Sequence, residues 1–158
     1  MAKFDVDLVE NEGAGVMYGP EKMGVLKRTV DFSMAANLLA QNKIMSLFKI
    51  PAKVLVTKVI MNVLTADADV TTVNMGVYTE AANGDITEVD LDGFGVNLDP
   101  HLVGLVANDV DAVYNSAGTG GRGYVNMSAE SIITLQNVDA QSLDSAVIEF
   151  YAVCEDLR

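Results

Sequence analysis

Tryptophan is absent from this chain of 158 residues, and aromatic residues make up only 6% of it. Sites that bind sugars or nucleobases rely on aromatic side chains as stacking platforms. Half of the residues are nonetheless hydrophobic, mostly aliphatic or methionine. The composition therefore favours a packed core over a stacking site, and the length suits one domain with such a core.

Cysteine and histidine occur once each, as Cys154 and His101. One cysteine excludes an intrachain disulfide, and one histidine excludes a multi-histidine metal site. We interpret Cys154, in the apolar run 148–154, as a buried packing residue and His101 as a surface loop residue. No serine lies in a nucleophile elbow, and no pair of carboxylates stands out. We therefore expect no enzyme, no catalytic residues, no cofactor and no metal site; a hydrolase on a β scaffold is the weakest alternative.

Long hydrophobic runs are also missing. The longest candidate, near residues 54–64, is interrupted by Lys58 and Asn62, and the opening Met1–Asp7 has no apolar signal region. A membrane-spanning helix needs about 20 predominantly apolar residues. We expect a protein made in the cytoplasm, with no membrane partner.

Basic residues are scarce after residue 60. Residues 61–158 hold two basic and sixteen acidic residues, whereas residues 1–60 hold eight basic and six acidic ones, for a net charge of −12. An acidic body repels phosphates, so we expect no nucleic-acid partner. The basic first third could face an acidic neighbour or a second copy of the chain.

Residues 1–24 differ from the rest because they are rich in glycine and lack hydrophobic periodicity. We interpret them as an extended N-terminal arm, either a tether onto a neighbouring subunit or a frayed terminus. Residues 25–158 would form one β-sandwich domain.

Short strands at near-regular spacing predict an all-β domain, a jelly-roll-like Greek-key sandwich with one short helix. Ser33 would cap that helix at Met34–Gln41, and Asn83-Gly84-Asp85 is a turn signal. Val54–Thr65 is the clearest strand, with its odd-numbered residues as the better core face. Other expected strands cover residues 25–32, 70–79 (with Gly76 at a bulge or close approach), 86–91, 102–107, 110–115, 123–127, 131–137 and 145–153.

Two motifs suggest a ligand-binding site, but the residues around them do not support one. Gly118–Gly123 matches G-x-G-x-x-G, but a strand rather than a helix is expected next, so we interpret it as a hairpin loop. Asp90-Leu91-Asp92-Gly93 and Asp109-Val110-Asp111 lack the further ligands of a calcium loop, and we interpret them as solvated acidic loops. A calcium ion shared between subunits is the alternative.

The order of several segments resembles small structural proteins of tailed bacteriophages, especially head decoration or cement proteins. Val30–Ser33 is similar to the family's Asp-Phe segment, and residues 50–66 to its Pro-Ala unit and long valine-rich strand; Lys53 stands where the family often has glycine. Val73–Tyr78 resembles the next strand with its glycine. Ser131–Asn137 and Ala146–Val153 resemble a closing, hairpin-like pair of strands.

This resemblance implies a virion structural protein that decorates the capsid surface, is made in the host cytoplasm, binds the major capsid protein and forms a homo-oligomer, expected to be a trimer. It carries over no catalytic residues. A tail or fibre component remains an alternative. The arm and the basic first third would form the interface, through Val16, Met17, Tyr18, Lys22, Lys27, Arg28, Lys49 and Lys53.

A carbohydrate-binding sandwich is the main alternative from another class. It would use aromatic residues near loop ends, with or without calcium. The candidates are Tyr78, Phe94, Tyr114 and Tyr124, and the absence of tryptophan counts against them.

Overall fold

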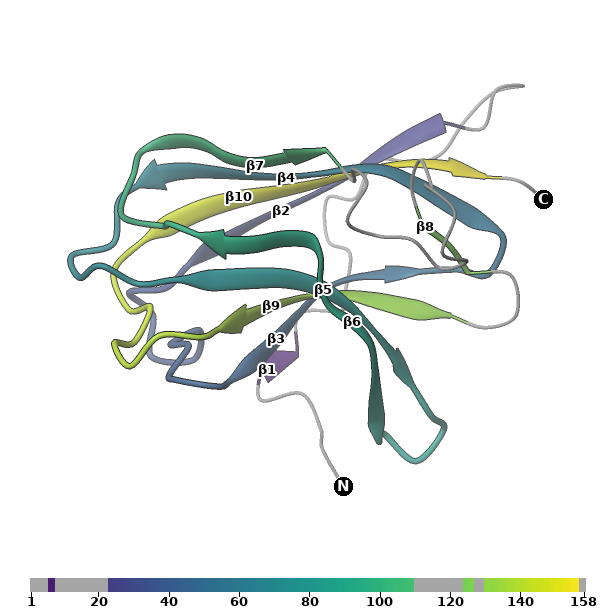
Figure 1. The fold of residues 1–158 in the computed structure, drawn as a ribbon, viewed down its shortest axis with the longest axis horizontal. Coiled ribbons are helices and arrows are strands. Elements are labelled where there is room, and N and C mark those ends of the chain that lie inside the picture. Colours follow the sequence, from purple (N-terminus) through teal and green to yellow (C-terminus); the bar gives the residue numbers. More distant parts are fainter. Residues whose placement is uncertain (1–5, 8–22, 110–123, 127–129, 157–158) are drawn as a thin grey trace.

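A computed structural model describes residues 6–7, 23–109, 124–126 and 130–156. Two β-sheets pack face to face, and no helix occurs in these residues (Figure 1). The strands are β1 (Val6–Asp7), β2 (Met23–Asp31), β3 (Ile44–Ile50), β4 (Val54–Thr65), β5 (Val73–Glu80), β6 (Ile86–Leu98), β7 (Gly104–Asp109), β8 (Tyr124–Asn126), β9 (Ser131–Asn137) and β10 (Val147–Asp156).

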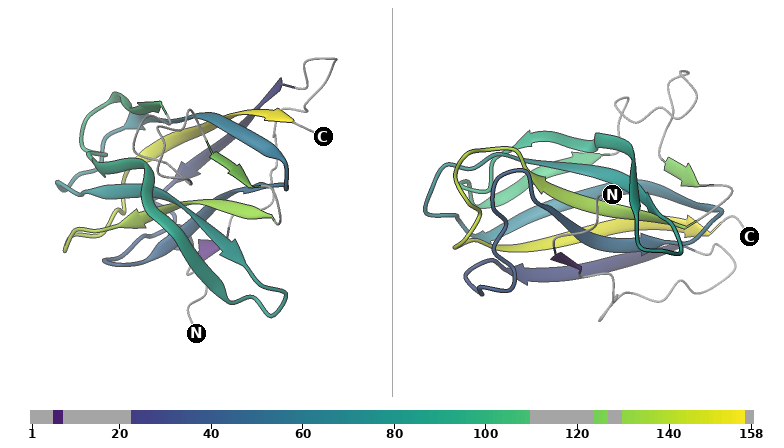
Figure 2. Two further views of the ribbon diagram at one scale, coloured as in Figure 1. Left: turned by 45° about the vertical axis from the view of Figure 1, so that its right-hand side comes forward. Right: turned by 90° about the horizontal axis from the view of Figure 1, so that it is seen from below.

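The chain passes repeatedly from one sheet to the other. One sheet, called sheet A here, has the order β1-β3-β9-β5-β6, and the other, sheet B, has the order β2-β10-β4-β7, with β8 also beside β4. All pairings are antiparallel except β1 with β3. The closing pair expected as hairpin-like is therefore wrong, because β9 and β10 lie in opposite sheets (Figures 1 and 2).

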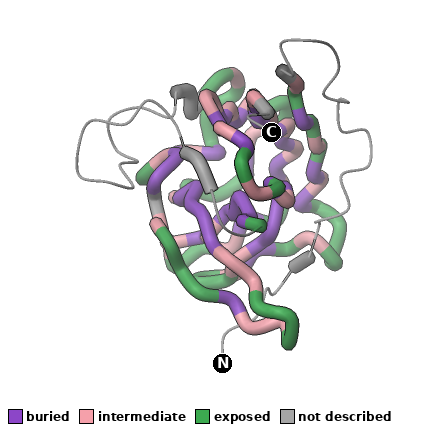
Figure 3. The backbone as a smooth tube through the Cα atoms, turned by 90° about the vertical axis from the view of Figure 1, so that its right-hand side faces the viewer, coloured by how far each residue is buried: buried purple, intermediate pink, exposed green. Residues whose placement is uncertain are grey.

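The core lies between the sheets, where the buried backbone gathers (Figure 3), and follows from strand alternation. In β10 the even-numbered Ile148, Phe150, Ala152 and Cys154 are buried, while the residues between them are partly exposed. Each large apolar side chain taken out of water contributes about 1.5–3 kcal/mol. The interpretation of Cys154 as a buried packing residue is confirmed, and burial raises the pKa of its thiol to about 12.

Strand β4 occupies the predicted residues, but its core face changes along its length. Val54 and Val56 are buried in the first part, whereas Val59, Met61 and Val63 are buried in the second. The pairing with β10 skips Thr57, so a β-bulge inserts one extra residue there. Because side chains alternate with a period of two, one extra residue exchanges the two faces. The prediction of an odd-numbered core face is therefore right only after Thr57.

The helix expected over Met34–Gln41 is wrong. Residues 32–43 form turns, and Leu39 makes reciprocal backbone hydrogen bonds with Leu143, 3.1 and 3.0 Å long. The side-chain carboxylate of Asp31 accepts from the backbone and hydroxyl of Ser33 at 3.0 and 2.6 Å, which favours a turn. Burial of Leu39 against the core thus overrides local helix propensity.

Most of the other predicted strands are present with shifted ends. Residues 131–137 match β9, while residues 86–91 form only the first part of the longer β6. The turn signal is confirmed: Gly84 has a φ of 81° and closes the β5–β6 hairpin. Ile44–Ile50 was not predicted as a strand, and it forms β3. Residues 110–115 lie outside the described residues.

Gly76 confirms the expected close approach. β6 has four residues between the partners of Met75 and Val77, where a regular ladder would have one, so its backbone bulges opposite Gly76. A Cβ at Gly76 would collide with the backbone carbonyl oxygens of Asp90 and Leu91.

We expect Gly76→Ala to lower the free energy of unfolding by about 1–3 kcal/mol, because backbone atoms cannot move aside as a side chain can. Urea unfolding measures this difference. Gly95→Ala is the matched control on the paired strand, since the atoms nearest its added Cβ belong to the side chain of Leu98, the first of them 2.9 Å away. Equal losses for the two variants would contradict the close-approach account.

Candidate interaction surface

The four expected interface residues that the structure describes do not gather into one basic patch. Lys27 lies on β2 of sheet B and Lys49 on β3 of sheet A. Arg28 lies on the core-facing side of β2, between the buried Leu26 and Val30. The other candidates are Lys53, exposed in the β3–β4 turn with a φ of 62°, and Val16, Met17, Tyr18 and Lys22, which fall outside the described residues.

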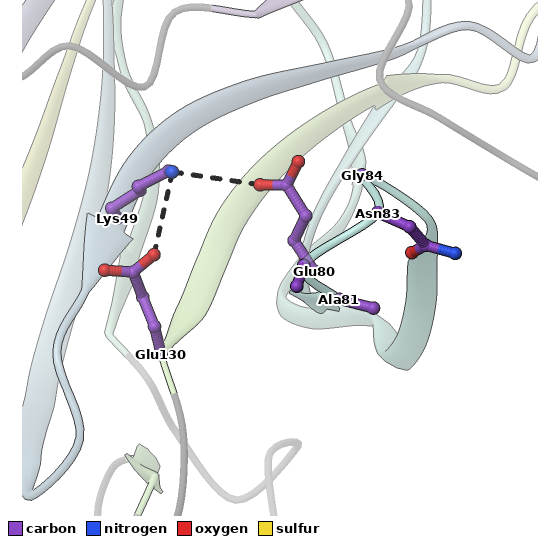
Figure 4. A pocket seen from close by; sticks show the side chains of 7 residues that line it. Lys49, Glu80, Ala81, Asn83, Gly84 and Glu130 are labelled. Carbon is purple, nitrogen blue, oxygen red and sulfur yellow. Dashed lines mark ion pairs between the residues drawn. The ribbon is translucent and has the colours of Figure 1, made fainter.

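Lys49 is paired with acids of its own chain. Its Nζ lies 3.8 Å from Glu80 and 3.6 Å from Glu130 (Figure 4). The three side chains border an open hollow of about 500 Å³ beside the β5–β6 turn. Asn83 of that turn also lines the hollow. Such exposed pairs contribute roughly 0–1 kcal/mol. Their main consequence is that the charge of Lys49 is locally balanced.

Lys27 is also paired, on the outer face of sheet B. Its Nζ lies 2.6 Å from Glu149 and 5.3 Å from the ring centre of Tyr151. The Tyr151 hydroxyl and the Asn62 amide donate to the same carboxylate at 2.7 and 3.3 Å. Hydrogen bonds from Lys27, which has the largest effect, and from Tyr151 hold the pKa of Glu149 below its ordinary 4.5. Glu149 in turn raises the pKa of Lys27.

The outer faces of the two sheets differ. In β9 of sheet A, side chains on both faces are buried, including the outward-facing Ile132 and Thr134. The outer face of sheet B instead keeps apolar side chains partly exposed to solvent. Tyr151 pairs there with Lys27 on one side and Ile60 on the other, and Val153 pairs with the exposed Val25.

The most exposed apolar side chains lie where β4 ends and β7 begins. Leu64, Leu102, Val103 and Leu105, the β7 corner, have exposed fractions of 47, 59, 70 and 74%. Asn62 pairs with Leu105 and Val63 with Gly104, so Leu105 shares the outer face of Asn62 and its network with Glu149. Contiguous exposed apolar surface of this kind marks interaction sites.

A buried carboxylate fixes the loops next to this corner. Oδ1 of Asp67 accepts hydrogen bonds from the backbone N–H groups of Asp144 and Ser145 at 3.3 and 3.0 Å and from the Ser145 hydroxyl at 2.9 Å. Oδ2 accepts from the Thr71 hydroxyl at 3.2 Å. Asp67 therefore joins the β4–β5 loop to the β9–β10 loop, with its charge satisfied by four donors.

The backbone of Asp67 holds the loop that carries the corner. Its N–H donates to the carbonyl of Pro100 at 3.0 Å, and its carbonyl accepts from Nδ1 of His101 at 2.8 Å. These bonds lie immediately before Leu102 and Val103. The expectation that His101 is a surface loop residue is confirmed, because it is exposed.

Asn137 fixes the same end of the sandwich from the other side. Its buried amide donates to the carbonyls of Leu39 and Gln141 at 2.8 and 2.7 Å, and its Oδ1 accepts from the N–H of Asp139 at 2.9 Å. Hydrogen bonds thus connect the β2–β3, β4–β5, β6–β7 and β9–β10 loops at the left-hand end of Figure 1.

Sequence reasoning missed Asp67 and the β7 corner. Asp67 stands between the predicted strands 54–65 and 70–79, where an aspartate is ordinarily solvated. Its burial depends on Ser145, which is 78 residues away. The corner residues carried a strand signal, but nothing in their pattern shows that their side chains face solvent.

The aromatic and acidic sites considered from the sequence are partly described by the structure. Tyr78 and Phe94 are buried with exposed fractions of 4 and 3%, so they cannot serve as stacking platforms for a sugar. Tyr114 falls outside the described residues, and Tyr124 lies in β8. Residues 90–93 are part of strand β6 and not of a loop, which corrects that interpretation.

The remaining motifs add no ligand site to this part of the chain. Residues 110–111 and 118–123 lie outside the described residues. Among the residues with described positions, no three His, Cys, Asp or Glu side chains cluster as metal ligands. Within the same ranges, no helix is long and apolar enough to cross a bilayer.

We expect Asp67→Ala to destabilise the fold by about 3 kcal/mol, because it leaves buried donors without an acceptor. Asp67→Asn should cost about 1 kcal/mol, since the amide oxygen can replace Oδ1 and the Thr71 hydroxyl can accept from the amide nitrogen. Thermal or urea unfolding of both variants measures the difference. The proposed role is wrong if the two substitutions have equal effects.

We expect Lys27→Met to raise the pKa of Glu149 toward 4.5, as followed by NMR titration of its carboxyl carbon. Because that pKa is lowered in the folded protein, the charged carboxylate stabilises the fold above pH 4.5, and this contribution disappears as the pH falls through the folded-state value. Tyr151→Phe should raise the pKa less, because Lys27 has the larger effect. An unchanged pKa in Lys27→Met would show that the ion pair is not formed in solution.

Comparison with known proteins gives a fold and no sequence family. No family model matches the chain, and no curated protein matches it by sequence. A chain of the capsid of Ralstonia phage GP4 superposes with a TM-score of 0.59 at 12% identity, over 85% of this chain and 84% of that one. A chain of the cyanophage Pam1 capsid asymmetric unit superposes with a TM-score of 0.54 at 13% identity, over 89% of each chain. The protein therefore shares its β-sandwich fold with chains of two phage capsids.

Proposed function

We propose that this protein is a structural component of a phage virion, located on the capsid surface as a decoration or cement protein. The observation that carries the proposal is the fold shared with chains of two phage capsids over nearly the whole of each chain. Because the covered shares are nearly equal, those chains are about as long as this one. The likeness thus concerns whole chains of this size and not one domain of a much larger protein.

The strand order supports the finer proposal of a jelly roll. Eight strands are counted in chain order: β2 to β7, then β9 and β10. The first pairs with the eighth, the second with the seventh, the third with the sixth and the fourth with the fifth. This nested pairing is that of a double Greek key, an architecture found in viral capsid and lectin domains.

The proposed role is structural and not catalytic. The protein would form a homo-oligomer, a trimer in the form we propose, and bind the major capsid protein through its N-terminal arm and exposed basic residues such as Lys53. The acidic body would keep densely packed copies soluble and away from free nucleic acid. Burial of Tyr78 and Phe94 removes two of the four aromatic candidates of the carbohydrate-binding alternative.

Co-sedimentation with shells assembled from the major capsid protein of the same phage tests this proposal. We expect the full chain to bind the shells, and deletion of residues 1–22, which spares β2 from its first residue Met23, to weaken binding at least tenfold. Lys53→Glu should weaken binding more than Lys43→Glu, a matched reversal at another exposed lysine.

The two parts of the proposal fail separately in this experiment. A full chain that leaves the shells unbound would overturn the decoration role. Unchanged binding of the folded deletion variant would overturn only the role of the arm.

A further inference from the structure

Strand β7 is an edge strand with few charged residues. It has β4 on one side, and among the described strands none pairs with its other side. Exposed edge strands can pair with other chains, and proteins protect them with charged residues. β7 (Gly104–Asp109) has no charged residue before its last position, and Leu105 is its exposed apolar side chain.

The outermost strands at the other three ends of the two sheets carry charge within the strand. β1 contains Asp7, β2 contains Lys27 and Arg28, and β6 contains Glu88, Asp90 and Asp92. Among the described strands, β7 has no charged residue before its last position, as is also true of the short β8 (Tyr124–Asn126) beside β4, and at β7 the β7 corner adds exposed leucine and valine side chains.

We propose that copies of this chain contact one another through the β7 corner, with Leu105 at the centre of the contact. The inference rests on the proposed homo-oligomer and names the surface that forms it. A chain with a net charge of −12 repels its own copies, so the surface that meets a symmetry axis must bring no like charges together. Leu64, Leu102, Val103 and Leu105 satisfy this requirement, and apolar surface is complementary to itself.

Two further features suit the corner to this contact. Asp67 holds the loop before β7 through Pro100 and His101, so little backbone freedom is lost on association. On the same outer face of sheet B, beyond Asn62 and its network with Glu149, the partly exposed Ile60 and Tyr151 add to the area available. A stable interface buries on the order of 1,600 Å² in total.

The test compares Leu105→Lys with Val89→Lys, a matched change at an exposed valine near the opposite end of the sandwich, on β6. Light scattering over a dilution series gives the mass of each protein relative to the 16.8 kDa monomer. We expect wild type and Val89→Lys to be oligomers. Leu105→Lys should weaken self-association roughly 30-fold or more, the effect of losing a central interface residue. Unfolding curves check that both variants are folded.

Cysteine cross-linking locates the contact. Leu105→Cys should form covalent dimers with a short bis-maleimide, whereas Val89→Cys should not. The native Cys154 stays silent because it is buried and its pKa is raised to about 12.

A monomeric wild type, or a Leu105→Lys variant that keeps the wild-type mass, would overturn the inference. Shell binding is measured separately, so a monomer that still binds shells would reject the corner contact and keep the decoration role.

Discussion

Sheet B depends on strand β10, which is hydrogen-bonded to β2 on one side and to β4 on the other. The end of the chain thereby joins its beginning, and the buried Ile148, Phe150 and Ala152 face the interior along the whole strand. Loop closure over such distances costs entropy that only the completed core repays. These buried side chains form part of the face of sheet B that packs against sheet A.

The same nested topology gathers four loops at one end of the sandwich, where buried polar side chains connect them. Asp67 and Asn137 each satisfy several backbone groups that would otherwise be buried without partners. A charged group inside a protein is tolerated only with such a complete set of donors. The same hydrogen bonds hold the loop that carries the exposed apolar residues before β7.

The described ion pairs balance charge locally. Lys27 and Lys49 are paired with acids of the same chain, so the charges of these two lysines are balanced within the fold. Asn62 lies between the uncharged β7 corner and the Lys27–Glu149 pair, and we propose the corner as the surface for contact between acidic copies. A structural component of a virion needs repeated contacts of this kind, together with an outer surface that stays soluble.

The sequence by itself determined the all-β class, the long strand Val54–Thr65, the strand at residues 131–137, the turn at Gly84 and the close approach at Gly76. These features follow from local alternation, β-branched residues and glycine geometry, which act over a few residues. Tertiary structure alone decided the rest. The bulge at Thr57 exchanged the faces of β4, contact with Leu143 replaced the expected helix around Leu39, and Ser145 turned Asp67 from a turn residue into a buried anchor. Each of these outcomes depends on a partner distant in sequence, and no local pattern records such a partner.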